Sequence, residues 1–246
     1  MRRVLILGGT GDAAEIAARV STIPAVEAIA SLAGRTRQPS VPAGNVRIGG
    51  FGGVAGLVSY LHEMSIDLVI DATHPFASQI SLNAAAATAE VGIPRLLFNR
   101  PAWEKVNGDR WIEVDNIEAA AAALLNQAYR VFLTVGRQEL SAFAYLEGIW
   151  FLMRVIDPPS PDALIPPGLV LCDRGPFALD NEREILIHHK IDTIVSKNSG
   201  GDATYAKIIA ARELGVQVVM VNRPAIPQGK QVSNVEDVVA WLLDNL

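Results

Sequence analysis

A glycine-rich turn close to the start of the chain has the composition of a phosphate-binding loop. The segment Gly8-Gly9-Thr10-Gly11-Asp12-Ala13 follows a short apolar run and precedes a helical pattern. Glycines let a backbone approach a pyrophosphate closely, and a helix N-terminus offers free N–H groups and a positive dipole end. No Gly-Lys-Ser or Gly-Lys-Thr follows, so the loop is not of the Walker type. We expect a dinucleotide here, with a plain tight turn as the alternative.

The residues after the second apolar run bear on which dinucleotide would bind. An NAD-binding chain usually carries Asp or Glu there, which bonds the ribose hydroxyls. This chain has Ser31, Gly34, Arg35 and Thr36 instead, with no acid among them. Arg35 would suit a 2′-phosphate as a charge-assisted donor, with Thr36 beside it. The sequence therefore favours NADPH as the cofactor, unless Arg35 and Arg37 are only solvated loop charges.

The loops after the third and fourth apolar runs would complete a cofactor site. The earlier loop starts at Gly49, and its expected cofactor contacts are Gly50, Phe51, Gly52 and Gly53. So many glycines indicate backbone lying against a cofactor, with a mobile linker as the alternative. The later loop is Asp71-Ala72-Thr73-His74-Pro75-Phe76, where Thr73 and His74 would lie near the nicotinamide. His74 is also the first candidate for a catalytic acid; water is the second, and a structural histidine is the alternative.

A polar loop in the second half of the chain would suit an anionic substrate. It is Ser196-Lys197-Asn198-Ser199-Gly200-Gly201, and it leads into a helical pattern. Lys197 and Arg137 both lie at expected strand ends, where they could meet carboxylates. The expected substrate-binding residues are Arg137, Lys197, Asn198, Ser199 and Gly200. Surface ion pairs are the alternative for the cations, including Arg154.

Motifs of several other enzyme classes do not occur in the chain. No tyrosine starts a Tyr-x-x-x-Lys pattern, which counts against a short-chain dehydrogenase. No Gly-x-Ser-x-Gly elbow of a hydrolase is present. The pair His188-His189 has no neighbouring cluster of Cys or His, so we expect no metal site.

Short apolar runs alternate with longer helical patterns along the chain. Runs such as residues 4–7, 68–70 and 193–195 lack two-residue alternation, which is typical of buried strands. Helical patterns such as residues 13–20 and 54–64 separate them. This order predicts an α/β fold with doubly wound, mainly parallel sheets. In such folds ligands bind at the carboxyl ends of the strands, where the loops described above would gather.

An internal repeat predicts two similar halves. Ile66-Asp67-Leu68-Val69-Ile70 resembles Ile191-Asp192-Thr193-Ile194-Val195, and Asn-Arg-Pro-Ala occurs after both, at Asn99 and at Asn222. A further Asn in each half, Asn116 and Asn234, would cap a final helix. Matches in one order at nearly one offset indicate a duplication. We expect an NADP-binding Rossmann-like domain at 1–126 and a Rossmann-like substrate domain at 127–246, with their loops around one cleft.

The composition excludes several broad classes. Half of the 246 residues are hydrophobic, which excludes a disordered protein, and a net charge of −5 argues against general nucleic-acid binding. The apolar run near the start ends at Gly8, too soon for a signal peptide, and no run is long enough for a membrane span. A single cysteine, Cys172, fits a reducing, cytoplasmic location. We expect a monomer that contacts neither nucleic acid nor membrane.

Taken together, the loops resemble the precorrin-6A reductase family of cobalamin biosynthesis. The specific part is the combination of Asp71-Ala72-Thr73-His74-Pro75-Phe76-Ala77 with Ser196-Lys197-Asn198-Ser199-Gly200-Gly201. The glycine-rich turn at Gly8, the segment from Ser31 to Thr36, residues 49–53 and Thr134-Val135-Gly136-Arg137 also match, in order. The resemblance implies NADPH-dependent reduction of one double bond of precorrin-6A, a small-molecule tetrapyrrole, to give precorrin-6B. Hydride would go to C19 and a proton to C18.

Two functions of other classes stay open from the residues alone. A non-catalytic NADP-sensing regulator would bind NADPH without oxidising it, and a two-lobed glycosyl or nucleotidyl transferase would prefer a sugar nucleotide. The second polar loop, residues 196–201, counts against the regulator because it suggests a second ligand. Arg35 and the lack of an acid beside it count mildly against the transferase.

Overall fold

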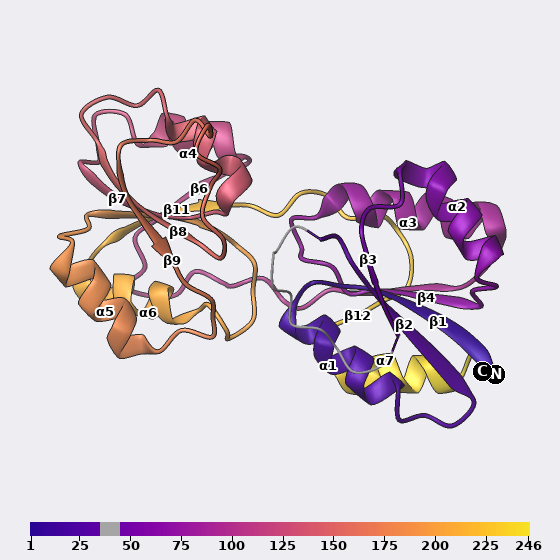
Figure 1. Ribbon diagram of the computed structural model, residues 1–246. Helices are drawn as coiled ribbons and strands as arrows, with labels where there is room; N and C mark the ends of the chain where they lie inside the picture. Colours follow the sequence, from indigo (N-terminus) through magenta and orange to yellow (C-terminus); the bar gives the residue numbers. More distant parts are fainter. Residues whose placement is uncertain (35–44) are drawn as a thin grey trace. The chain divides into compact units, whose positions relative to one another are not determined.

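Two parallel β-sheets with helices on both faces make up the structure (Figure 1). A computed structural model describes residues 1–34 and 45–246. Each sheet has six strands, and all of the strand pairs are parallel. The predicted α/β fold is thereby confirmed. Arg35 and Thr36 lie outside the described residues, so their contacts with a cofactor stay predictions.

The chain forms two compact units. Unit 1 comprises Met1–Pro101 and Pro224–Leu246, with the strand order β12-β5-β4-β1-β2-β3. Its strands are β1 (Arg2–Leu7), β2 (Val26–Leu32), β3 (Asn45–Ile48), β4 (Leu68–Asp71), β5 (Arg95–Phe98) and β12 (Gln231–Val232). One face is covered by α1 (Gly11–Val20) and α7 (Val235–Leu243), the other by α2 (Gly53–Glu63) and α3 (Ser78–Val91) (Figure 1).

Alternating side chains of β1 build the core of unit 1 on both faces of its sheet. Ile6 belongs to a buried cluster that includes Ile16 of α1 and Trp241 of α7. Leu5 belongs to the cluster on the opposite face, which includes Leu57 of α2. Because successive strand residues point to opposite faces, a strand buried on both sides is apolar throughout, as the sequence predicted. Packing on both faces thus fixes the position of β1, and the glycine-rich turn follows directly after its last residue, Leu7.

Unit 2 comprises Ala102–Arg223 and repeats the architecture, with the strand order β6-β11-β10-β7-β8-β9. Its strands are β6 (Trp111–Val114), β7 (Arg130–Thr134), β8 (Trp150–Val155), β9 (Gly168–Cys172), β10 (Thr193–Lys197) and β11 (Gln217–Val221). Its helices are α4 (Ile117–Ala123), α5 (Leu179–His188) and α6 (Ala206–Leu214). A 3₁₀ helix, η1 (Arg137–Phe143), stands where unit 1 has α1.

The observed division of the chain corrects the predicted boundary between residues 126 and 127. Strand β6 comes from the first half of the sequence, yet it pairs with β11 of unit 2, where Val218 faces Trp111. Strand β12 comes from the second half, yet it pairs with β5 of unit 1, where Leu97 faces Gln231. The helices follow their strands: α4 packs on η1 and α7 packs on α1. The two halves therefore exchange their last strand and helix.

The expected helix caps are confirmed at both ends of this exchange. The Asn116 side chain accepts a hydrogen bond from the Ala119 N–H, and Asn234 accepts one from the Asp237 N–H, each at 2.8 Å. Such a cap satisfies an N–H group that has no partner within the helix. The identical strand order of the two sheets agrees with the duplication.

Candidate functional site

Backbone hydrogen bonds bring the predicted cofactor loops together at the carboxyl edge of unit 1. The Gly8 N–H donates to the Ser31 carbonyl at 3.0 Å, which joins the turn after β1 to the end of β2. The Ala72 N–H donates to the Leu7 carbonyl at 2.9 Å, and the Thr10 hydroxyl donates to the Ala72 carbonyl at 3.1 Å. The loops after β1, β2 and β4 are thus neighbours, as the parallel order requires.

The turn between β1 and α1 has the shape of a phosphate cradle. Thr10 caps α1, because its hydroxyl accepts from the Ala13 N–H at 3.0 Å. Gly9 has a φ of +115°, which favours glycine, and a Cβ at Gly8 would lie 2.9 Å from the Ala13 methyl. A Cβ at Gly9 or Gly11 would meet no atom of the described residues within 4 Å. The open space before the helix N-terminus therefore fits a pyrophosphate.

The carboxylate of Asp12 is occupied by Arg100, which follows β5. The two side chains form an ion pair at the start of α1, and both are partly buried. The pair offsets the negative charge that Asp12 would otherwise place beside a bound phosphate. Asp12 was predicted to bind the cofactor; the structure shows its side chain bound to Arg100. Arg100 was not among the predicted site residues, although it lies in the repeated Asn-Arg-Pro-Ala segment.

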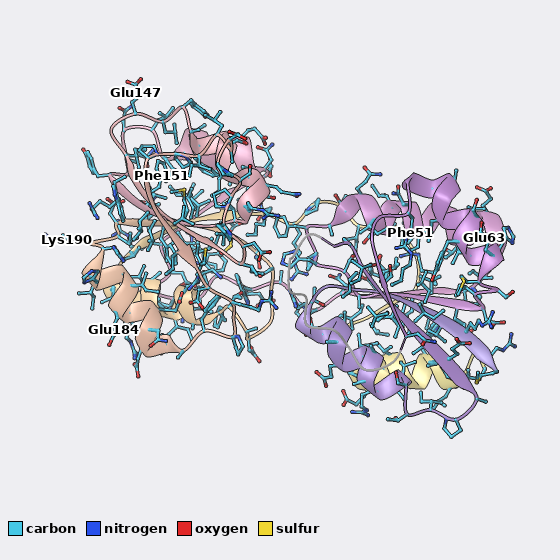
Figure 2. The ribbon with its side chains drawn as sticks, in the orientation of Figure 1. Phe51, Glu63, Glu147, Phe151, Glu184 and Lys190 are labelled. Atoms are coloured by element: carbon cyan, nitrogen blue, oxygen red, sulfur yellow. The ribbon has the colours of Figure 1, made fainter. Side chains whose placement is uncertain are left out.

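Residues 49–53 form a defined loop rather than an unstructured linker. The Gly49 N–H donates to the Leu32 carbonyl at 2.8 Å, which fixes the loop to the end of β2. Phe51, which is labelled in Figure 2, packs edge-on against Tyr60 of α2, with 5.2 Å between the ring centres. Gly52 and Gly53 have φ values of +81° and +89°, so this turn into α2 requires glycines.

Arg47 of β3 holds this loop and was not singled out from the sequence. Its guanidinium donates to the carbonyls of Gly49 and Gly50, at 2.5 and 2.7 Å, and to the Ser31 hydroxyl at 3.3 Å. It also lies over the Phe51 ring, 3.7 Å from the ring centre. Burial raises the pKa of Tyr60, and the nearby Arg47 charge opposes that rise. A positive charge therefore stands at the junction of the β2 and β3 loops.

The loop after β4 is organised by Asp71, which is fully buried. Its carboxylate accepts hydrogen bonds from the Thr73 hydroxyl at 2.8 Å and the Thr73 N–H at 3.2 Å. Arg95 lies 4.0 Å from the same carboxylate. Burial lowers the pKa of Arg95, whereas Asp71 opposes the change. The Thr73 hydroxyl, predicted to face the nicotinamide, is thus held by a buried acid.

His74 accepts a local hydrogen bond through one ring nitrogen. Its Nδ1 accepts from the Phe76 N–H at 3.2 Å, and its carbonyl accepts from the Ala77 N–H at 2.7 Å. This contact assigns the proton of a neutral His74 ring to Nε2. The ring is partly exposed at the carboxyl edge. The geometry allows either of the roles considered for His74, structural or catalytic.

The predicted cations of unit 2 have protein partners. Lys197 forms an ion pair with Glu139 of η1. Arg137 donates to the Pro158 carbonyl at 3.3 Å. A substrate carboxylate at Lys197 would share this cation with Glu139 or displace that acid.

The Asn198 amide bonds the backbone of Trp103. Its amide accepts from the Trp103 N–H at 2.8 Å and donates to the Trp103 carbonyl at 2.9 Å. Arg223 donates to the carbonyls of Asn198 and Ser199, at 2.8 and 2.9 Å. Gly200 has a φ of +67° that a side chain would strain. The structure thus places Asn198, Ser199 and Gly200 in one braced loop, but the Asn198 amide is already bonded.

A buried charged cluster lies behind this loop. Arg154 and Glu182 form a two-pronged ion pair, with exposed side-chain fractions of 4% and 1%. Lys207 donates to the Thr204 carbonyl at 2.8 Å and lies over the Trp103 ring. Burial, reinforced by Arg154 and opposed by Glu182, lowers the pKa of Lys207 to about 7. Arg154 is therefore a core cation and not the surface residue that the sequence allowed.

The comparisons with known proteins agree along the whole chain. The model of the precorrin-6x reductase CbiJ/CobK family matches residues 3–243. The chain belongs to this family. A precorrin-6A reductase of Rhodococcus erythropolis is 47% identical over 98% of both chains, and one of Rhodobacter capsulatus is 43% identical over 100% of this chain and 97% of that one. A solved structure titled CobK precorrin-6A reductase has a TM-score of 0.94 at 43% identity, covering 100% of this chain and 97% of its own.

Less similar relatives are named for a different substrate, cobalt-precorrin-6A. A cobalt-precorrin-6A reductase of Priestia megaterium is 27% identical over 98% of both chains. Within the described residues of this CbiJ/CobK family member, no helix is long and apolar enough to cross a membrane. The described part also contains no group of three or more His, Cys, Asp or Glu residues that could hold a metal ion.

Proposed function

We propose that this protein is a precorrin-6A reductase that uses NADPH and yields precorrin-6B in cobalamin biosynthesis. The observation that carries the proposal is full-length identity of 43–47% with relatives named precorrin-6A reductase. The glycine cradle before α1 supports a dinucleotide cofactor, and Arg47, like the predicted Arg35, supports a phosphorylated ribose. The protein would act in the cytoplasm on a small molecule, as a monomer.

The proposed roles of the residues follow from their places in unit 1. When bound, NADPH supplies the hydride, which the family resemblance directs to C19 of the macrocycle. The N–H groups before α1 hold the pyrophosphate, and Gly9 and Gly11 leave space for it. The loop from Phe51 to Gly53 and the Thr73 hydroxyl orient the nicotinamide side. His74 or water delivers the proton to C18.

The basic residues of unit 2 are proposed to hold carboxylates of the macrocycle. Arg137 and Lys197 supply the charge, and Ser199 and Gly200 shape the loop beside them. Asn198 contributes by bracing that loop on Trp103 rather than by direct contact.

The names of the more similar relatives support a metal-free macrocycle as the substrate of this protein. The relatives at 43–47% identity are named for precorrin-6A, whereas those named for cobalt-precorrin-6A are 27–28% identical. We therefore expect faster reduction of precorrin-6A than of its cobalt complex. Parallel assays with both substrates at equal concentration would measure the ratio of kcat/KM.

A spectroscopic assay tests the proposed reaction directly. The protein is mixed with precorrin-6A and NADPH, and the NADPH absorbance and the macrocycle spectrum are followed together. We expect both to change in equal molar amounts. NADPH binding without oxidation would favour the redox-sensing regulator instead, and tighter binding of a sugar nucleotide would favour the transferase.

Arg35→Ala tests the cofactor assignment made from the sequence. We expect the KM for NADPH to rise at least about tenfold, because a charge-assisted hydrogen bond to phosphate contributes roughly 1.5–3 kcal/mol. The KM for NADH should change less, since NADH lacks the 2′-phosphate. Equal losses with both cofactors would remove Arg35 from the phosphate site.

A further inference from the structure

The Arg47 guanidinium is held at the carboxyl edge of unit 1 by neutral acceptors. Its three hydrogen bonds go to the carbonyls of Gly49 and Gly50 and to the Ser31 hydroxyl. A guanidinium has five N–H donors, so Nε–H and one Nη2–H stay without an acceptor among the described residues. No described carboxylate lies within 4.0 Å of Arg47. Its charge is thus ordered but not neutralised by the protein around it.

In unit 2 an arginine from a different strand lies over the corresponding phenylalanine, and there its charge is neutralised. Arg154 lies over Phe177, 3.6 Å from the ring centre, much as Arg47 lies over Phe51. Both phenylalanines stand two residues before the helix that follows. Arg154 is bonded through two nitrogens to Glu182 and is almost completely buried with it. The arginines come from different strands, because β8 corresponds to β2 and β3 corresponds to β9, but the two phenylalanine loops correspond. Of these two loops, that of unit 2 has a carboxylate bonded to its arginine.

Gly56 keeps the corresponding acid out of unit 1. It stands five residues after Phe51, as Glu182 stands five residues after Phe177. A Cβ at Gly56 would lie 1.8 Å from the Phe51 carbonyl oxygen, so the loop and α2 pack too closely for a side chain. A partly exposed guanidinium with only neutral partners can pair with a phosphate without first giving up a carboxylate. At this loop unit 2 supplies its own carboxylate, Glu182. Among the described residues unit 1 supplies none, so a bound ligand could bring the negative charge.

We propose that Arg47 binds the 2′-phosphate of NADPH and is a specificity-determining residue of this reductase. The proposal rests on the proposed cofactor. The guanidinium bonds Ser31, whose carbonyl accepts from Gly8 of the glycine cradle, so the charge stands beside the expected pyrophosphate site. Arginine suits phosphate because its fixed N–H donors match the phosphate oxygens in pairs. The same side chain holds Gly49 and Gly50, so phosphate binding and the shape of the loop depend on one residue.

The test measures dinucleotide affinity by titration calorimetry, without turnover. NADPH and NADH are each titrated into the full-length wild type, Arg47→Gln, Arg47→Lys and Arg19→Gln. Arg19 is a control because it is exposed in the last turn of α1, far along the helix from the cradle, and lies 3.8 Å from Glu236. We expect Arg47→Gln to raise the Kd of NADPH at least about tenfold and that of NADH less than about threefold. Arg47→Lys should fall between, and Arg19→Gln should resemble the wild type.

Every other result overturns either the role of Arg47 or the assignment of NADPH as the cofactor. If Arg47→Gln weakens NADPH and NADH by the same factor, Arg47 only holds the loop and the proposal is overturned. Unchanged NADPH affinity overturns it as well. A wild type that binds NADPH no better than NADH, or binds neither, overturns the cofactor assignment itself, which distinguishes that failure from a failure of Arg47. If thermal unfolding shows that Arg47→Gln does not fold, Arg47→Lys decides, because it keeps the charge but not the paired donors.

Discussion

The amide of Asn198 bonds both polar groups of the Trp103 backbone, and this contact can be tested. Asn198→Asp keeps the acceptor for the Trp103 N–H but places a second oxygen against the Trp103 carbonyl. We expect the free energy of unfolding to fall by about 2–3 kcal/mol, because a buried carbonyl loses its donor and faces a charge. Asn83→Asp is a matched control, since Asn83 only accepts a hydrogen bond from Gln79 on the surface of α3. Urea denaturation of both variants gives the comparison, and equal effects would contradict the buried role of Asn198.

Lys207 should make stability depend on pH above neutrality. Its pKa is lowered from 10.5 to about 7 in the folded chain, beside Arg154 and Glu182. Between these values the unfolded chain binds more protons than the folded chain, so the free energy of unfolding rises with pH, by up to about 1.4 kcal/mol per pH unit. Below pH 7 both states are protonated and this gain is absent. Lys207→Met removes the effect, so urea denaturation at pH 7, 8 and 9 should show a growing advantage of the wild type. A constant difference would contradict the lowered pKa.

The contact between α2 and the loop before it depends on Gly56. In a helix interior, Gly→Ala usually stabilises by roughly 0.5–1 kcal/mol. Here the added Cβ would lie 1.8 Å from the Phe51 carbonyl, so we expect Gly56→Ala to destabilise unit 1 and weaken NADPH binding. Gly11→Ala is the matched control for stability, because its Cβ would meet no described atom within 4 Å. It should unfold like the wild type yet bind NADPH more weakly, since the methyl group enters the phosphate cradle. Thermal unfolding and NADPH titration separate the two effects, and a stabilised Gly56→Ala would contradict the close packing.

The exchange of the last strand and helix decides which fragments can fold. Residues 102–223 contain all six strands of the second sheet in one continuous segment. Residues 127–246 match the duplicated half better, but they lack β6 and α4 and carry β12 and α7 without the sheet of unit 1. We expect fragment 102–223 to unfold cooperatively and fragment 127–246 not to, because the latter exposes the apolar face of α7, including Trp241, and an unpaired strand edge. Far-UV circular dichroism during heating checks both, and cooperative unfolding of 127–246 alone would contradict the exchange.

Much of the fold and part of the candidate site could be predicted from local patterns. The apolar runs around residues 4–7 and 193–195 are strands, the Asn116 and Asn234 caps start helices, and the turn at Gly8 precedes α1. Each of these depends on residues adjacent in the chain, where periodicity and capping act. Strands β6 and β12 were missed because both are short edge strands that pair with a sheet built mainly from the other half.

The sequence by itself determined most of the strand–helix order, the duplication, the glycine-rich turn before the first helix and the family to which the chain belongs. The tertiary structure decided where the chain divides and which polar side chains are already bonded to the protein. Asn198 and Arg47 show the reason. Neither residue type reveals whether its partner will be Trp103, Ser31 or a ligand, because these two partners lie 95 and 16 residues away in the chain. A buried polar group must be satisfied by whatever the fold brings beside it, and only the packed chain specifies that neighbour.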